Sequence, residues 1–148
     1  MNVAEQNVIA PPTQERPSRG FRIGSWVATG LFSAMMAWSG ALYVIGDPHF
    51  VEAMAELGYP RYFMTMLGAA KLMGVAALVA PPKLLPKTLR EWAYAGFTFD
   101  LVAAIISYLA MGGGSHVPPP AFALVLVLAS YFMRRRVTED AASRARPT

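Results

Sequence analysis

Four long stretches with almost no charged side chains constrain the fold of this chain more than any other feature. The stretches are residues 23–45, 62–80, 92–111 and 117–133. The first and the last carry no charge, and the middle two carry one each, Lys71 and Asp100. A helix needs about 20 apolar residues to cross the hydrocarbon core of a bilayer. The pattern therefore predicts four transmembrane helices.

An all-α membrane domain is the fold class that these stretches indicate. Only 15% of the residues are charged, whereas a soluble domain has roughly 25%. Helices buried in a soluble bundle would each keep a polar face, and these stretches have none. Because the connections are short, we expect a membrane-embedded up-down four-helix bundle over residues 21–136. Its predicted spans are residues 23–45, 62–80, 89–111 and 117–133.

Basic residues are distributed unevenly between the segments outside the spans. Eleven of the 13 Lys and Arg residues precede the first span, follow the fourth, or lie between the second and the third. The two other connections contain Arg61 beside Asp47, Glu52 and Glu56. Cytoplasmic loops of membrane proteins carry such an excess of Lys and Arg. We therefore predict an inner-membrane location with both termini in the cytoplasm.

The two ends of the chain and its net charge indicate which kinds of partner to expect. Residues 1–20 are polar, contain three prolines and are predicted to be a disordered cytoplasmic tail; residues 137–148 are predicted to be a second cytoplasmic tail. The net charge of +4 follows from the topology, so nucleic acid is not an expected partner. The expected partner is the lipid bilayer. Membrane or redox proteins and a second copy of the chain are further candidates.

The first outer connection has the pattern of a short amphipathic helix over residues 48–57. Asp47 suits its N-cap, Pro48 its first helical position and Gly58 its C-cap. Its apolar side chains at helical spacing are Phe50, Val51, Met54 and Leu57. We expect this helix to lie at the outer membrane surface.

Two further local sequence patterns predict where the third and fourth long helices begin. Residues 88–91 (Thr-Leu-Arg-Glu) have the form of a capping box, which predicts that the third long helix begins at Leu89. Three prolines at 118–120 suit the start of the fourth helix, where missing N–H groups cost little.

Lys71 and Asp100 are the residues with the strongest indication of a special role. Each costs roughly 2.5–3.5 kcal/mol to place at the centre of a spanning helix. Both are near the middle of their stretches, in helices that run in opposite directions, so both lie near the midplane. We expect them to form an ion pair between the second and third spanning helices. The pair is either a structural device that fixes helix register or a polar centre that binds a ligand.

Small residues surround both charges and favour close helix approach there. They are Gly68 and Gly74 around Lys71, and Ala93, Gly96, Ala103 and Ser107 around Asp100. We therefore predict that both charges face the bundle interior rather than lipid.

Other candidate sites have weaker support. His49 and His116 both lie on the outer side and could join a metal site, but they lack ligand spacing, so no metal is predicted. The chain has no cysteine, which excludes disulfides, thiol relays and iron–sulfur ligation. No catalytic residue and no cofactor are predicted, although a quinone or lipid can bind between helices without a sequence motif.

Several short motifs resemble the DoxX-like family of small membrane proteins. They are Leu57-Gly58-Tyr59-Pro60, Leu67-Gly68-Ala69-Ala70-Lys71-Leu72-Met73-Gly74 and Glu91-Trp92-Ala93-Tyr94-Ala95-Gly96-Phe97, with Ser107 and His116 near a glycine-rich turn. The resemblance covers roughly residues 24–135 and implies a four-helix integral membrane protein. The family is named for its resemblance to subunits of an archaeal thiosulfate:quinone oxidoreductase, and some relatives associate with redox proteins. The resemblance picks out Lys71 but gives no counterpart for Asp100.

Three functional hypotheses follow from these observations. The first is a non-catalytic subunit or adaptor of a membrane system, with a system linked to redox proteins or quinones as one candidate. The second is a small carrier, or a lipophile- or quinone-binding protein, that uses Lys71 and Asp100. The third is an enzyme that acts on a quinone or lipid. The missing redox motifs weigh against autonomous electron transfer, so the sequence favours the first hypothesis.

The topology can be tested by cysteine labelling, since the native chain has no cysteine. In intact cells, cysteines placed at Thr88 and Thr148 should be shielded from an impermeant thiol reagent, and one placed at Ser115 should be labelled. Labelling at Thr88 in sealed cells would overturn the predicted orientation.

Overall fold

The structure, a computed structural model, describes residues 19–81 and 83–144, and the elements in this part are all helices. The four long helices are α1 (Arg19–Ile45), α3 (Arg61–Val79), α4 (Lys87–Ala110) and α5 (Pro118–Arg144). A short helix α2 (Pro48–Glu56) follows α1, and a 3-10 turn η1 (Gly114–His116) precedes α5. The predicted all-α fold class is confirmed.

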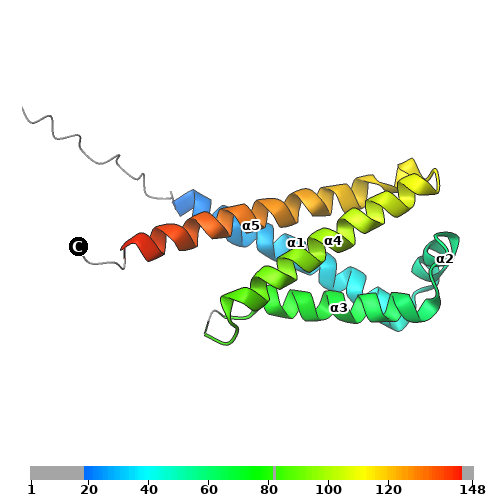
Figure 1. Cartoon of the computed structure of the whole chain (residues 1–148), viewed down its shortest axis with the longest axis horizontal. Helices are drawn as coiled ribbons and strands as arrows, with labels where there is room; N and C mark the ends of the chain where they lie inside the picture. The colour runs from blue at the N-terminus through cyan, green and yellow to red at the C-terminus, as the bar shows by residue number, and fades with distance from the viewer. Residues whose placement is uncertain (1–18, 82, 145–148) are drawn as a thin grey trace, which may run out of the picture.

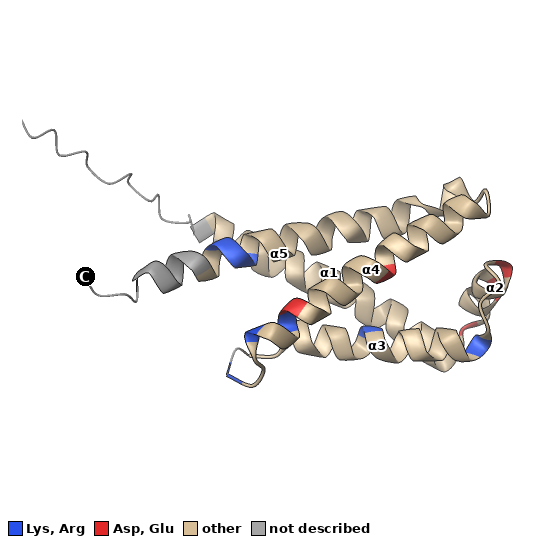
Figure 2. Ribbon diagram, viewed as in Figure 1, with Lys and Arg blue, Asp and Glu red and all other residues tan. Residues whose placement is uncertain are grey.

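The long helices form a closed ring of neighbours. The α1 helix packs on α3 and α5, and α4 packs on the same two helices, so α1 and α4 lie diagonally opposite. Successive long helices run in opposite directions (Figure 1). The described ends of the chain and the 80–86 connection lie at one end of the bundle, which we call the basic end, and α2 lies at the other, the α2 end. Figure 2 shows most Lys and Arg residues at the basic end.

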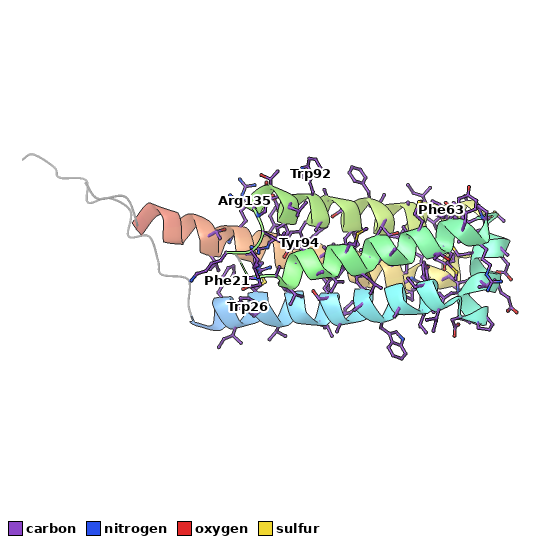
Figure 3. The ribbon with its side chains drawn as sticks, turned by 90° about the horizontal axis from the view of Figure 1, so that it is seen from below. Phe21, Trp26, Phe63, Trp92, Tyr94 and Arg135 are labelled. Carbon is purple, nitrogen blue, oxygen red and sulfur yellow. The ribbon has the colours of Figure 1, made fainter. Side chains whose placement is uncertain are left out.

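The outer surface of the bundle is apolar along its length. All four long helices contain a stretch long and apolar enough to cross a membrane. Large side chains such as Trp38, Trp92 and Phe99 are more than 70% exposed, and Figure 3 shows Trp92 pointing away from the bundle. Exposed apolar surface on this scale requires a nonaqueous environment. The protein is therefore an integral membrane protein that crosses the bilayer four times.

Helix α2 begins as the sequence predicts, and it ends one residue earlier than predicted, with Leu57 at the C-cap and Gly58 directly after it. The Asp47 carboxylate accepts a hydrogen bond from the His49 N–H at 3.1 Å. At the other end Gly58 has a φ of +79°, and the Gly58 and Tyr59 N–H groups bond back to the Ala55 and Met54 carbonyls. This is the glycine-terminated arrangement that satisfies the last carbonyls of a helix.

The apolar side of α2 faces the bundle. Met54 is buried, and the Phe50 ring meets the Tyr43 ring of α1 edge-on at 5.2 Å. Helix α2 packs on α1 and α3 and so covers one end of the bundle.

The capping box predicted for the third long helix is wrong. The α4 helix begins at Lys87 with Pro86 at the N-cap, and no side chain caps it. Pro86 already has extended backbone angles and its carbonyl accepts the Leu89 N–H, so the helix starts two residues early. Glu91 pairs instead with Lys87 one turn before it, at 3.8 Å.

The last helix is longer than its predicted span. The sequence predicts a helix over 117–133 and a tail from 137, but α5 is continuous from Pro118 to Arg144. Between residues 121 and 146 the chain has neither glycine nor proline, so nothing in the backbone ends the helix at the last apolar residue. The predicted disordered tail over 1–20 lies almost wholly outside the described residues.

Gly68 offers a direct test of helix packing. A Cβ added there would lie 2.7 Å from the Tyr43 Cβ and 2.8 Å from the Gly40 carbonyl oxygen, both on α1. At Gly30 an added Cβ meets nothing within 4 Å. Gly68→Ala should therefore cost about 1–3 kcal/mol of stability through overpacking, and Gly30→Ala should cost nothing. Equal thermal melting of the two variants in detergent would contradict this packing.

Candidate functional site

The structure brings Lys71 and Asp100 together in the middle of the bundle. The Lys71 Nζ lies 3.4 Å from Asp100 Oδ2. Their side chains are 9% and 15% exposed, respectively. Lys71 is near the middle of α3, and Asp100 is near the middle of α4. Two opposite charges in contact reduce the cost of placing either one in a poorly solvated interior.

Lys71 has two further partners, both from α1. The Ser39 hydroxyl accepts a hydrogen bond from Nζ at 3.4 Å, and Nζ lies 4.4 Å from the centre of the Tyr43 ring. The close approach of α1 and α3 at Gly40 and Gly68 brings these partners within reach. The ammonium is thus surrounded by a carboxylate, a hydroxyl and an aromatic face.

A cavity of about 320 Å³ lies between α3 and α4 and includes the ion pair in its wall. It extends from Lys71 and Asp100 toward the α2 end, where it is lined by Met54 of α2 and by Leu57, which directly follows α2. Its volume falls within the range of about 300–1,000 Å³ that is typical of small-molecule sites.

Aromatic and apolar side chains form most of the remaining wall. Tyr59 and Phe63 stack with ring centres 4.9 Å apart, and Phe63 lies near the α2 end in Figure 3. The Tyr59 hydroxyl forms a hydrogen bond with the Ser107 hydroxyl at 3.0 Å, which joins the connection after α2 to α4. A few polar groups in an apolar, aromatic cavity are the usual composition of a ligand site.

The cavity also has a lateral side formed by α4. Gly96, Phe99 and Ala103 line it, and all three are exposed on the bundle surface. In a membrane, lipid lies next to that surface.

The predicted small face serves two different purposes. Gly68 allows α3 to approach α1, and Gly74 leaves room for the Phe97 ring, which an added Cβ would meet at 2.7 Å. Gly96 and Ala103, however, are not at a tight helix contact: both are exposed, and a Cβ at Gly96 meets nothing within 4 Å. The expectation of close helix approach around these two residues is wrong, because the cavity occupies that space.

The two histidines lie at the α2 end without a shared ligand cluster. His49 stacks edge-on with Phe50, and the ring of His116 stacks on Tyr108. Among residues 19–81 and 83–144, no group of three His, Asp or Glu side chains is placed to hold a metal ion.

A second polar cluster in the core was missed by the sequence analysis. Ser130 of α5 is fully buried, and its hydroxyl forms hydrogen bonds with Thr29 of α1 at 2.6 Å and with Tyr94 of α4 at 2.9 Å. The repeat of Ser25, Thr29 and Ser33 at four-residue spacing was the available signal, since it places three hydroxyls on one face of α1.

The sequence analysis also missed two arginines of neighbouring helices that donate hydrogen bonds to backbone carbonyls at the end of α3. Arg90 of α4 donates to the Ala80 carbonyl at 2.8 Å, and Arg134 of α5 donates to the Leu78 carbonyl at 3.0 Å. The prolines at 81 and 82 have no N–H to donate to the preceding helix turn, so cationic donors from neighbouring helices take that place. Arg134 also lies over the Trp26 ring at 4.9 Å.

The ion pair can be tested by a double-mutant cycle. Lys71→Met or Asp100→Leu alone leaves a buried charge without its partner, which should cost about 3–5 kcal/mol. The double variant has no unpaired charge, so much of the lost stability should return. Thermal unfolding in detergent measures all four proteins. Losses that simply add in the double variant would show that the two residues do not interact.

Comparison with known proteins supports the membrane fold. The sequence model of the DoxX-like family matches residues 27–130, a region that contains Lys71, Asp100, the whole of the second and third spanning segments and most of the first and fourth. No curated protein and no solved structure gives a significant match to the chain. Since the match covers more than half of the sequence, the chain belongs to the DoxX-like family.

Proposed function

We propose that this protein binds a lipophilic small molecule with a polar head group in the cavity between α3 and α4. The observation that carries the proposal is the position of the Lys71–Asp100 pair in the wall of an otherwise apolar and aromatic cavity. A polar head would lie near the pair. The hydrophobic part would extend past Phe99 toward the bilayer.

The cavity favours this hypothesis over that of a non-catalytic subunit or adaptor. A helix bundle that only holds partner proteins has no use for a cavity of about 320 Å³ at its polar centre. Replacing a buried ion pair by apolar residues is often neutral or stabilising, so a purely structural role gives little reason to keep one. Binding a ligand gives both features a purpose.

Quinones fit the shape of this site as one class of ligand. The stacked rings of Tyr59 and Phe63 offer flat faces to a planar head, and Tyr43 and Tyr108, which also line the cavity, each carry a hydroxyl group. The protein would act as a carrier or as the lipophile-binding subunit of a membrane system. Phenolic lipids share the same planar shape and belong to the same candidate class.

Two glycines provide a matched test of the cavity. Gly96 and Gly30 both lie in long helices, both are exposed, and an added Cβ meets nothing at either, but only Gly96 lines the cavity. Leucine is a better helix former than glycine, so neither Gly96→Leu nor Gly30→Leu should unfold the protein. The Gly96→Leu side chain should occupy space that the ligand needs.

The measurement is binding of decyl-benzoquinone and para-octylphenol to the purified protein in nanodiscs. At least one probe should bind saturably to the wild type and to Gly30→Leu, and Gly96→Leu should weaken that binding about tenfold or more. Saturable binding of neither probe, or equal binding by the two leucine variants, would refute the proposed site.

A further inference from the structure

The two residues of the ion pair differ in the hydrogen bonds that they can still form with a ligand in the cavity. Lys71 has three N–H donors, and its ammonium already faces the Asp100 carboxylate, the Ser39 hydroxyl and the Tyr43 ring. No donor of Lys71 is left over for a molecule in the cavity.

Asp100, unlike Lys71, has hydrogen-bonding capacity that no other residue uses in the described part of the chain. A carboxylate can accept about four hydrogen bonds through two oxygens. Within residues 19–81 and 83–144, its one polar partner is the Lys71 ammonium, on Oδ2. The side chain remains 15% exposed and lines the cavity. The free hydrogen-bonding capacity of the pair is therefore that of an acceptor.

The charge of a ligand's head group also decides whether it can bind to this acceptor. An anionic head would meet the Asp100 carboxylate while Lys71 has no donor to spare for it. A cationic head on the second carboxylate oxygen would lie close to the Lys71 ammonium, and like charges repel strongly where water is scarce. A neutral group that donates a hydrogen bond meets neither difficulty.

The other polar groups of the cavity favour a hydroxyl among the neutral donors. Tyr43 and Tyr108 carry hydroxyl groups on residues that line the same space, and these can donate to an oxygen atom. A hydroxyl can donate to Asp100 and accept from such a tyrosine at the same time. The aromatic wall formed by Tyr59, Phe63 and Phe99 suits a ring next to that hydroxyl.

From these contacts we infer that the cavity selects a neutral phenolic head group. The Asp100 carboxylate accepts a hydrogen bond from the phenol hydroxyl, and Lys71 is a positioning residue. The inference rests on the proposed function and names the ligand class for the same cavity. It assigns specificity to Asp100 and no ligand contact to Lys71.

The test compares two probes that differ at one position, where the hydroxyl hydrogen of the first is replaced by a methyl group in the second. Para-octylphenol and para-octylanisole have the same ring and tail, but the ether oxygen of the anisole can only accept. Because hydrogen bonds to a charged group are the stronger ones, the phenol should bind the wild-type protein in nanodiscs about tenfold tighter or more. A third probe, para-octylbenzylammonium, should bind more weakly than the phenol.

The matched variant is the double substitution Lys71→Met with Asp100→Asn. It removes the charged acceptor without leaving an unpaired charge, so it avoids the folding defect expected of Asp100→Asn alone. In this variant the preference for the phenol should fall clearly, since a neutral amide oxygen accepts a weaker hydrogen bond than a carboxylate. Lys71→Met combined with Asp100→Leu has no acceptor at this position, so it should bind the phenol and the anisole with nearly equal affinity.

The outcomes separate the two proposals. If the wild type binds phenol and anisole equally, or the ammonium most tightly, the inference about the head group is wrong and the cavity stays a lipophile site. The inference also fails if either double variant keeps the wild-type preference for phenol. If decyl-benzoquinone binds saturably to the wild type and the phenol does not, the inference alone is overturned. If neither the quinone nor any of these three probes binds saturably, the proposed function is overturned as well.

Discussion

The arrangement of this bundle depends on two opposite charges that must be kept in contact where water is scarce. Lys71 and Asp100 stand on different helices near the middle of the membrane domain. Either charge alone would be expensive there, so α3 and α4 must hold their registers to within the reach of a lysine side chain. The α1 helix then completes the surroundings of the ammonium through Ser39 and Tyr43.

That requirement explains why the contacts between helices are unequal. The α1 and α3 helices approach closely at Gly40 and Gly68, where an added Cβ would lie 3.1 Å and 2.7 Å, respectively, from the nearest atom of the other helix. The α3 and α4 helices meet through Phe97, which fills the space beside Gly74, and leave a cavity beyond the ion pair. The charge on Lys71 is well enclosed on its α1 side, while Asp100 keeps one side toward the cavity.

Between the ion pair and the basic end lies an apolar layer. Along α1 the order is Thr29, Phe32, Ser39, and along α4 it is Tyr94, Phe97, Asp100. The Phe32 and Phe97 rings meet edge-on at 5.0 Å, so they separate the Thr29–Ser130–Tyr94 hydrogen bonds from the ion pair. Most of the residues that line the cavity lie between this layer and the α2 end.

The sequence was sufficient for the large features, because hydropathy blocks, caps and isolated charges act locally. It predicted the four spans, the α2 helix with Asp47 and Gly58 at its ends, and the residues of the ion pair. It could not predict the cavity, because Gly96 and Ala103 have the same small size as residues at tight helix contacts. Only the packing of the other helices decides which small residues are covered. The start of α4 was misplaced because Pro86 competed with the capping box at Thr88, and both patterns are common at helix starts.

The most direct measurement of the central claim is the distance between the Lys71 ammonium and the Asp100 carboxylate in a bilayer. Solid-state NMR on protein with ¹⁵N in lysine side chains and ¹³C in aspartate carboxyl groups reports that distance through dipolar coupling. The chain has three lysines and three aspartates, and Lys87 pairs with a glutamate, so the signal is nearly specific. A coupling that reflects direct contact, and that is lost in Lys71→Met, is the predicted result. An ammonium signal from Lys71 without coupling to any carboxylate would contradict the account.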